Sequence, residues 1–391
     1  MVCCSLYDVR KDEFHDGSLF NNALPDGAIR LTSKPKTIFD YDFTNSYSSK
    51  FKKLNIEADL KLSILTGLVD VSLSGKYLSS TDENSRTIKL TIIYCLKTKR
   101  EQLNLSHNLL ENCLSINTFN NQNITHIVTG ITWGANVYAT CEKTVKHLEE
   151  KREIEGKLRV KLEKMGPLVS AGVGGSINND KRSEVNQESF RISFSGDVLI
   201  KQIPSTIEDV MEMVKTIPSI VETINEGKGI QLEYSLYPLK EIVFQLKQDV
   251  QIHFVLYRLN EYIVTEIENE FDAILEAQRK FNDIVNDIEA LQIHIPREAY
   301  DIVMNKKRDI DTELGLLRQD LAIAIERVRR GLNTDKQQLN SVETILQQFK
   351  HNSSCSVQEI RKFIDDNNML KKKISLLKTF QEKGVELIDK D

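Results

Sequence analysis

Residues 147–163 read HLEEKREIEGKLRVKLE, and this stretch satisfies two periods at once. Its odd-numbered positions are all polar or charged, whereas the even positions from 154 to 162 hold Ile, Gly, Leu, Val and Leu. As a strand it would therefore have one charged face and one apolar face. As a helix, Ile154, Leu158, Leu162 and Met165 would share one face, because they recur at spacings of three and four. A segment that fits both periods is what a conversion from helix to β-hairpin requires.

Three other stretches, at residues 56–64, 88–94 and 190–200, alternate apolar and polar residues as strands do. A strand that spans a bilayer needs about 9–11 residues, and it is stable only in a closed barrel that is apolar outside and polar inside. Half-exposed strands of soluble antiparallel sheets alternate in the same way, so the pattern leaves both interpretations open. The candidates for membrane insertion are Ile56, Leu60, Leu62, Ile64, Ile154, Leu158, Val160, Leu162, Phe190, Ile192 and Phe194.

The composition is that of a globular protein with two or three domains. The chain has 391 residues, of which 40% are hydrophobic and 28% are charged. Its net charge of −5 gives no basic field, so nucleic acid is not an expected partner.

The chain changes character near residue 250, which predicts one domain over 1–250 and a second over 254–391. The first half mixes strands with a helix that follows Thr206 and closes at Pro218, and residues 230–236 alternate as a strand. The second half has helical periods throughout, and its short loops predict an up-and-down four-helix bundle. The expected helices cover about 254–291, 297–330, 334–349 and 356–383.

No catalytic or ligand-binding motif is present in the sequence. GxSxG, HExxH and the P-loop are all missing, the six cysteines form no CxxC pair, and no two histidines have ligand spacing. We therefore expect no enzymatic activity, no cofactor and no metal. The N-terminus has no apolar signal-peptide core, which predicts a soluble chain that is cytoplasmic or is secreted without a signal peptide.

Several short motifs resemble those of the stonustoxin-like proteins, a branch of the MACPF/CDC pore-forming superfamily. Residues 125–136, THIVTGITWGAN, resemble the central-strand signature THVVTGxxYGAN of that family. The motifs stay collinear from residue 6 to about 240, and the helical half is similar to the focal-adhesion-targeting-like bundle that follows in the family. The other matching motifs are LYDVR at 6–10, GSLF at 17–20, LSGKYL at 73–78, SFSGD at 193–197 and YPLK at 237–240.

The resemblance implies an α+β fold, in which a bent four-stranded antiparallel sheet is flanked by two helical clusters. Each cluster would unfurl into a transmembrane hairpin after subunits form a ring, the first within about 50–88 and the second within about 143–190. Gly130 and Gly134 would be hinges of the central strand, and Gly174 and Gly175 would ease refolding of the second segment.

Two functions follow as hypotheses. The first is a pore-forming protein that associates with a lipid membrane and assembles as a homo-oligomer, or as a hetero-oligomer with a homologous subunit. The second is a non-lytic scaffold or adaptor of the same fold, which acts on a protein partner through its helical bundle.

Overall fold

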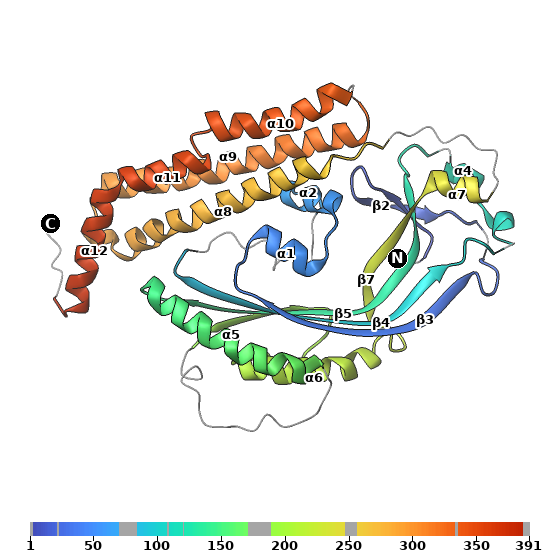
Figure 1. The fold of residues 1–391 in the computed structure, drawn as a ribbon, viewed down its shortest axis with the longest axis horizontal. Helices are drawn as coiled ribbons and strands as arrows, with labels where there is room; N and C mark the ends of the chain where they lie inside the picture. Colours follow the sequence, from blue (N-terminus) through green and yellow to red (C-terminus); the bar gives the residue numbers. More distant parts are fainter. Residues whose placement is uncertain are drawn as a thin grey trace.

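A computed structural model describes residues 3–21, 23–69, 84–107, 109–119, 121–170, 189–246, 256–332 and 335–385. Figure 1 shows a long curved sheet with helices on both of its faces, and a set of C-terminal helices that runs alongside it. Residues 247–255 lie outside the described residues, so the predicted domain boundary at 250–254 stays a prediction. The α+β class, with an antiparallel sheet followed by helices, is confirmed.

The sheet is antiparallel throughout and is organised around strand β5. The order of the path is β2-β1-β5-β4-β3, while β6 pairs with residues 137–142 of β5 and β7 pairs with residues 126–134. The strands are β1 (Ser5–Asp8), β2 (Glu13–Ser18), β3 (Ile29–Asp42), β4 (Thr87–Leu103), β5 (His126–Thr144), β6 (Arg191–Gly196) and β7 (Ile230–Pro238).

The strand pairing is irregular on both sides of Gly134. The register of β4 on β5 shifts between Lys97 and Arg100, and the register of β7 on β5 shifts between Thr132 and Trp133. Such bulges increase the local twist and bend a strand. A Cβ atom on Gly134 would overlap the carbonyl oxygen of Leu96, so only glycine allows β4 and β5 to approach this closely.

Helices α5 (Leu148–Ser170) and α6 (Ile207–Glu222) cover one face of the sheet. The prediction that α6 closes at Pro218 is wrong, because the helix continues for four more residues. A proline inside a helix removes one backbone hydrogen bond, and here the apolar face continues beyond it, with Ile217 and Val221 both buried.

Helices α1 (Tyr47–Leu54) and α2 (Ala58–Thr66) lie on the opposite face (Figure 1). The alternation at residues 56–64 is therefore not used as a strand in this structure. Leu62 and Leu65 are buried in a core that α1 and α2 share with the C-terminal helices. The short elements at the far end of the sheet are a 3-10 turn at Leu110–Cys113, α4 (Ile116–Phe119) and α7 (Leu239–Gln245).

The C-terminal helices follow the predicted order with shifted ends. Helix α8 begins at Glu261, where the Asn260 side chain accepts a hydrogen bond from the backbone nitrogen of Ile263 at 2.9 Å. The last predicted helix is in fact two helices, which meet at Asn367. In Figure 1, α10 and α11 follow one another along α8 and α9, and α12 crosses their end. The bounds are α8 (Glu261–Ala290), a 3-10 turn (Gln292–His294), α9 (Arg297–Arg329), α10 (Asp335–Asn352), α11 (Val357–Asp366) and α12 (Asn368–Glu382).

Candidate membrane-inserting segments

The two candidate segments leave the sheet at the same end. The first segment, residues 43–86, connects β3 to β4, and the second segment, residues 145–190, connects β5 to β6. Thr87 pairs with Thr144, and Glu142 pairs with Arg191, so the strand ends that bound both segments are neighbours in the sheet. Because α1 and α2 cover one face of the sheet and α5 covers the other, the described parts of the two segments lie on opposite sides of the sheet.

In the second segment the helical period decides which candidates are buried. Ile154, Leu158 and Leu162 lie in the core between α5 and the sheet, with 6%, 0% and 0% of their surfaces exposed. Val160 is 53% exposed on the outside of the same helix. The structure therefore brings three of the four candidates together and leaves Val160 in water.

The candidates around β6 join that same core from the sheet. Phe190, Ile192 and Phe194 are partly buried against it, and Ile192 and Phe194 pair with Cys141 and Ala139 of β5. The apolar sides of α5 and of β6 thus face a common interior.

The charged residues of α5 are spread around the helix. The Arg159 guanidinium lies 4.5 Å from the centre of the Phe43 ring, Lys161 pairs with Glu208, and Lys157 pairs with Glu153 at 2.8 Å. In a strand, residues 153, 157, 159 and 161 would instead lie on one side. Conversion would therefore break these contacts and separate the charges from the apolar residues.

The candidates of the first segment belong to a different core. Leu62 is fully buried, and Ile56 and Ile64 are partly buried against α8 and its neighbours. Leu60 is 36% exposed. None of these four packs against the candidates of the second segment, so the two groups are held by separate contacts.

Helix α8 holds the beginning of the first segment. The carboxylate of Asp272 accepts hydrogen bonds from the backbone nitrogen of Tyr47 and from the Ser48 hydroxyl, both at 2.6 Å. Arg279 donates to the carbonyl oxygen of Asn45 at 2.8 Å. These contacts satisfy backbone groups where α1 begins, and they fix α1 against α8.

Helix α8 also holds the end of the first segment. Asp283 accepts a hydrogen bond from the backbone nitrogen of Ser85 at 3.0 Å, and Asp287 pairs with Arg86 at 2.5 Å. Burial raises the pKa of Asp283, while its contacts with Ser85 and Arg86 act in the opposite direction. We call the contacts of Asp272, Arg279, Asp283 and Asp287 with residues 45–48 and 85–86 the α8 clasp.

The α8 clasp was not among the predicted sites, although the sequence contains a signal for it. Residues 272, 279, 283 and 287 are charged and recur at spacings of seven and four, which places them on one face of a helix. Charged residues at helical spacing usually lie on the solvent-exposed face of a helix. Only the tertiary structure shows that these four residues bind the two ends of the first segment.

A buried ion pair ties α9 to the same region. Arg329 pairs with Asp12 at 3.1 Å, and their side chains are only 3% and 5% exposed. Arg329 also donates to the carbonyl oxygen of Asp59 in α2 at 2.6 Å. Burial, the charge of Asp12 and a hydrogen bond to Asp12 raise the pKa of Tyr7. The pair links α9 to both the β1–β2 turn and the first segment.

The central strand carries the predicted hinge residues Gly130 and Gly134. The approach of β4 requires Gly134, whereas a Cβ atom on Gly130 would lie 3.1–3.3 Å from Ser235 and from the carbonyl oxygen of Glu101. Gly174 and Gly175 lie outside the described residues. At the start of the same strand, burial lowers the pKa of His126 to about 4, and its Nδ1 lies 2.9 Å from the Thr125 hydroxyl.

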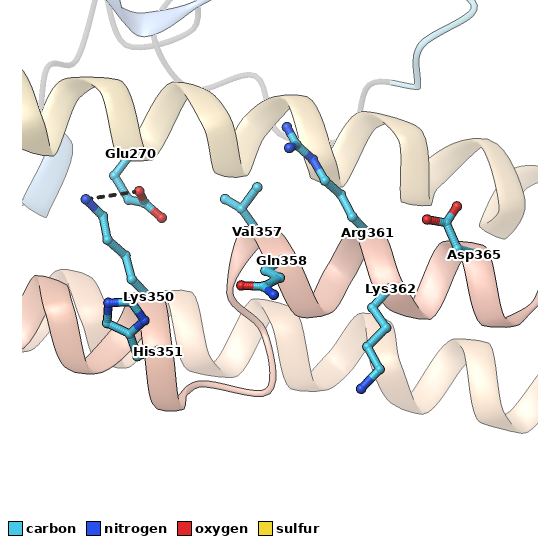
Figure 2. Close-up of a pocket in the computed structure, with 8 residues that line it drawn as sticks. All are labelled: Glu270, Lys350, His351, Val357, Gln358, Arg361, Lys362 and Asp365. Carbon is cyan, nitrogen blue, oxygen red and sulfur yellow. Dashed lines mark ion pairs between the residues drawn. The ribbon is translucent and has the colours of Figure 1, made fainter.

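A surface groove between α8, α10 and α11 shows no catalytic arrangement (Figure 2). Lys350 pairs with Glu270 at 3.5 Å and with Glu266 at 3.1 Å, so its positive charge is neutralised by carboxylates of α8. Arg361 extends from α11 toward α8, while Lys362 points away from it. Across the described ranges, no group of three or more His, Cys, Asp and Glu side chains is arranged to hold a metal ion. Nor does any helix in those ranges combine the length and hydropathy that a membrane span needs.

Comparison with known proteins identifies the family. The family model described as "SNTX, MACPF/CDC-like domain" matches residues 2–262, which is more than half of the chain. The chain belongs to this family. The SNTX assignment agrees with the central strand, the two helical clusters and the bent sheet described above.

Curated relatives of the chain include toxin subunits from Synanceia horrida and Scorpaena plumieri. The chain is 24% identical to stonustoxin subunit beta of Synanceia horrida over 345 residues, covering 88% of this chain and 47% of the relative. It is 23% identical to stonustoxin subunit alpha over 376 residues, or 96% of this chain and 50% of the relative. It is 25% identical to cytolytic toxin-beta of Scorpaena plumieri, covering 71% and 38%. The chain thus spans about half the length of these relatives or less.

A solved stonustoxin structure has the same fold. It matches with a TM-score of 0.65 at 18% identity, and it covers 98% of this chain and 48% of the stonustoxin chain. The likeness extends over the C-terminal helices as well as the sheet.

Proposed function

We propose that this chain is a non-enzymatic, membrane-perforating protein that oligomerises and converts residues 43–86 and 145–190 into transmembrane β-hairpins. The observation that supports this most strongly is the double period of residues 154–162. These residues form a helix whose apolar face is buried, and the same residues alternate as a bilayer-spanning strand does.

The lengths of the two segments suit the conversion. They contain 44 and 46 residues, so each arm of a hairpin has about 22 residues and a reach of about 70 Å at about 3.3 Å per residue. A bilayer requires about 9–11 residues of each arm. The remaining residues would connect the sheet to the membrane.

The energetic balance also favours conversion at a membrane. Ile154, Leu158 and Leu162 would exchange a protein core for hydrocarbon, so their burial from water is kept. Val160 would gain burial that it lacks in the soluble form. The charged odd-numbered residues would face a water-filled lumen, where they remain solvated.

Oligomerisation follows from the chemistry of the lipid interior. Lipid cannot satisfy the backbone groups of a free strand edge, so the hairpins of one copy are not stable alone. The sheet path ends at β3, whose residues 29–36 have exposed side chains, and this edge is available to a neighbouring copy. The neighbour would be a second copy or a homologous subunit, as the paired alpha and beta names of the relatives indicate for those toxins.

The α8 clasp must open before the first segment can leave. Its ion pairs and hydrogen bonds are partly buried, with the Arg86 and Asp287 side chains 16% and 18% exposed, so water must enter to solvate these groups when the clasp opens. The second segment contacts the first directly, because Lys151 of α5 donates to the carbonyl oxygen of Ser85 at 2.9 Å and Arg159 lies over the Phe43 ring. We therefore propose that opening the clasp also loosens α5.

The direct test is release of a trapped dye from liposomes, with electron microscopy of the same samples. Leakage that rises steeply with protein concentration, together with ring-shaped particles on the vesicles, is the expected result. Intact vesicles across neutral and anionic compositions would contradict the proposal, because a perforating protein must act on some lipid surface.

A further inference from the structure

Helix α12 lies across the end of the C-terminal helices with one face buried. Ile374 is 4% exposed, and Leu370 and Leu377 pack beside it against the core that includes α8. Figure 1 shows α12 turning away from the line of α11 and crossing the ends of α8 and α9.

The outer side of α12 combines an apolar stripe with lysines. Met369, Leu376 and Phe380 are 77%, 55% and 38% exposed, and their spacings of seven and four align them within about 40° at about 100° per residue. Three exposed lysines lie within about 60° of that stripe. We call this surface the α12 face, and it consists of Met369, Lys372, Lys373, Leu376, Phe380 and Lys383.

The charge of α12 is opposite to that of the chain as a whole. Residues 368–383 contain five lysines and one glutamate, a net charge of +4, whereas the chain carries −5. An exposed apolar stripe between lysines is the pattern of helices that lie in the interface of anionic membranes.

Ion pairs hold α12 beside the ends of β4 and β5 to which the two segments are attached. Lys378 pairs with Asp287 at 2.5 Å, and the same carboxylate pairs with Arg86, the residue before β4. Glu382 pairs with Lys146, two residues after β5, at 3.6 Å. The α12 face is therefore carried at the end of the sheet from which both segments leave.

We propose that the α12 face docks the chain on the surface of an anionic lipid bilayer. A second copy of the chain is a poorer occupant, because a symmetric contact through this face would bring like charges together. The inference rests on the proposed function only in taking a bilayer as the partner. It adds the lipid class and the surface that makes first contact.

The test is co-sedimentation of the full chain with vesicles of phosphatidylcholine, with and without phosphatidylserine. The triple variant Lys372→Gln, Lys373→Gln and Lys383→Gln should bind phosphatidylserine vesicles at least about tenfold more weakly, since each lysine near an anionic surface contributes about fivefold. The matched control, Lys201→Gln, Lys240→Gln and Lys362→Gln, removes three exposed lysines elsewhere and should bind like the parent.

Two results would overturn the proposal. One is equal binding by the parent and the α12 triple variant while both keep the same thermal unfolding. The other is a dimer of the parent in solution that Leu376→Ser converts to a monomer, which would make a second copy the occupant.

Dye release separates this inference from the proposed function. A chain that binds through α12 and releases no dye supports the docking surface and contradicts perforation. Dye release that the α12 triple variant retains in full supports perforation and contradicts the docking surface.

Discussion

Replacement of Val160 by lysine tests the conversion of α5 with little effect on the soluble protein. Val160 is 53% exposed, and exposed substitutions away from special features change stability by about 0.5 kcal/mol or less. Lysine also favours a helix slightly more than valine does. Leu158 would not serve, because it is fully buried and a lysine there would carry its charge into the core.

In the inserted strand the same lysine would face lipid. Position 160 lies between 158 and 162 on the apolar side, two residues from the centre of the stretch from 154 to 162. A lipid-facing lysine at the bilayer midplane costs about 2–4 kcal/mol, which lowers the insertion equilibrium of each subunit by roughly 30- to 700-fold. We expect dye release to require at least about tenfold more of the Val160→Lys protein.

The assay compares dye-release titrations with urea unfolding of the same preparations. Val160→Leu keeps an apolar side chain and should leak like the parent. Glu163→Lys adds a lysine at another exposed position of α5 that would face the lumen, and it should also leak. The reasoning is refuted if folded Val160→Lys leaks at parental concentrations, or if Glu163→Lys loses activity to the same extent.

Three further predictions concern the soluble fold. Arg329→Ala should lower the free energy of unfolding by about 3–5 kcal/mol, because it leaves the buried Asp12 carboxylate with hydroxyl donors but without its charged partner; a change under about 1 kcal/mol in urea titrations would contradict this. Gly134→Ala should yield little folded protein, whereas Gly130→Ala should fold with a modest loss, as circular dichroism and melting temperature would show; equal melting temperatures would argue against the close approach at Gly134. Burial lowers the pKa of His126 to about 4. Between pH 6.5 and pH 4 the imidazole is therefore neutral in the folded protein but protonated in the unfolded chain. Stability should therefore fall as the pH drops from about 6.5 to about 4, by at most about 1.4 kcal/mol per unit, and His126→Gln should reduce that slope in urea titrations at several pH values; an unchanged slope would contradict the assignment.

The sequence was sufficient for parts of the sheet and for the apolar face of α5, whereas β1, β2 and β3 were not predicted, and the described part of the chain forms a seven-stranded sheet where the family resemblance implied four strands. The alternation at 88–94 and 230–236 appears in β4 and β7, and the spacing of Ile154, Leu158 and Leu162 appears as a buried helical face. Each of these elements buries one apolar face against one neighbouring layer of the fold. The spacing of apolar residues along the sequence is therefore enough to predict it.

The predictions that needed tertiary context were less complete. The alternation at 56–64 did not predict helix α2, because the core that buries Leu62 is supplied by helices more than 200 residues later in the chain. Pro218 did not end α6, since the buried face continues through Val221. The α8 clasp depends on residues that are distant in sequence, and no local pattern specifies which backbone groups Asp272 and Asp283 accept from.

The most direct measurement is a polarity-sensitive fluorophore placed on cysteine at positions 160 and 163, with Cys95 and Cys113 replaced by serine. Both positions are exposed on α5, and they lie within about 60° of each other around a helix, whereas they fall on opposite sides of a strand. On vesicles that leak, the probe at 160 should enter an apolar environment that a lipid-borne quencher reaches, and the probe at 163 should stay in water. If both probes change together, or neither changes while dye escapes, residues 154–162 do not span the membrane as a strand.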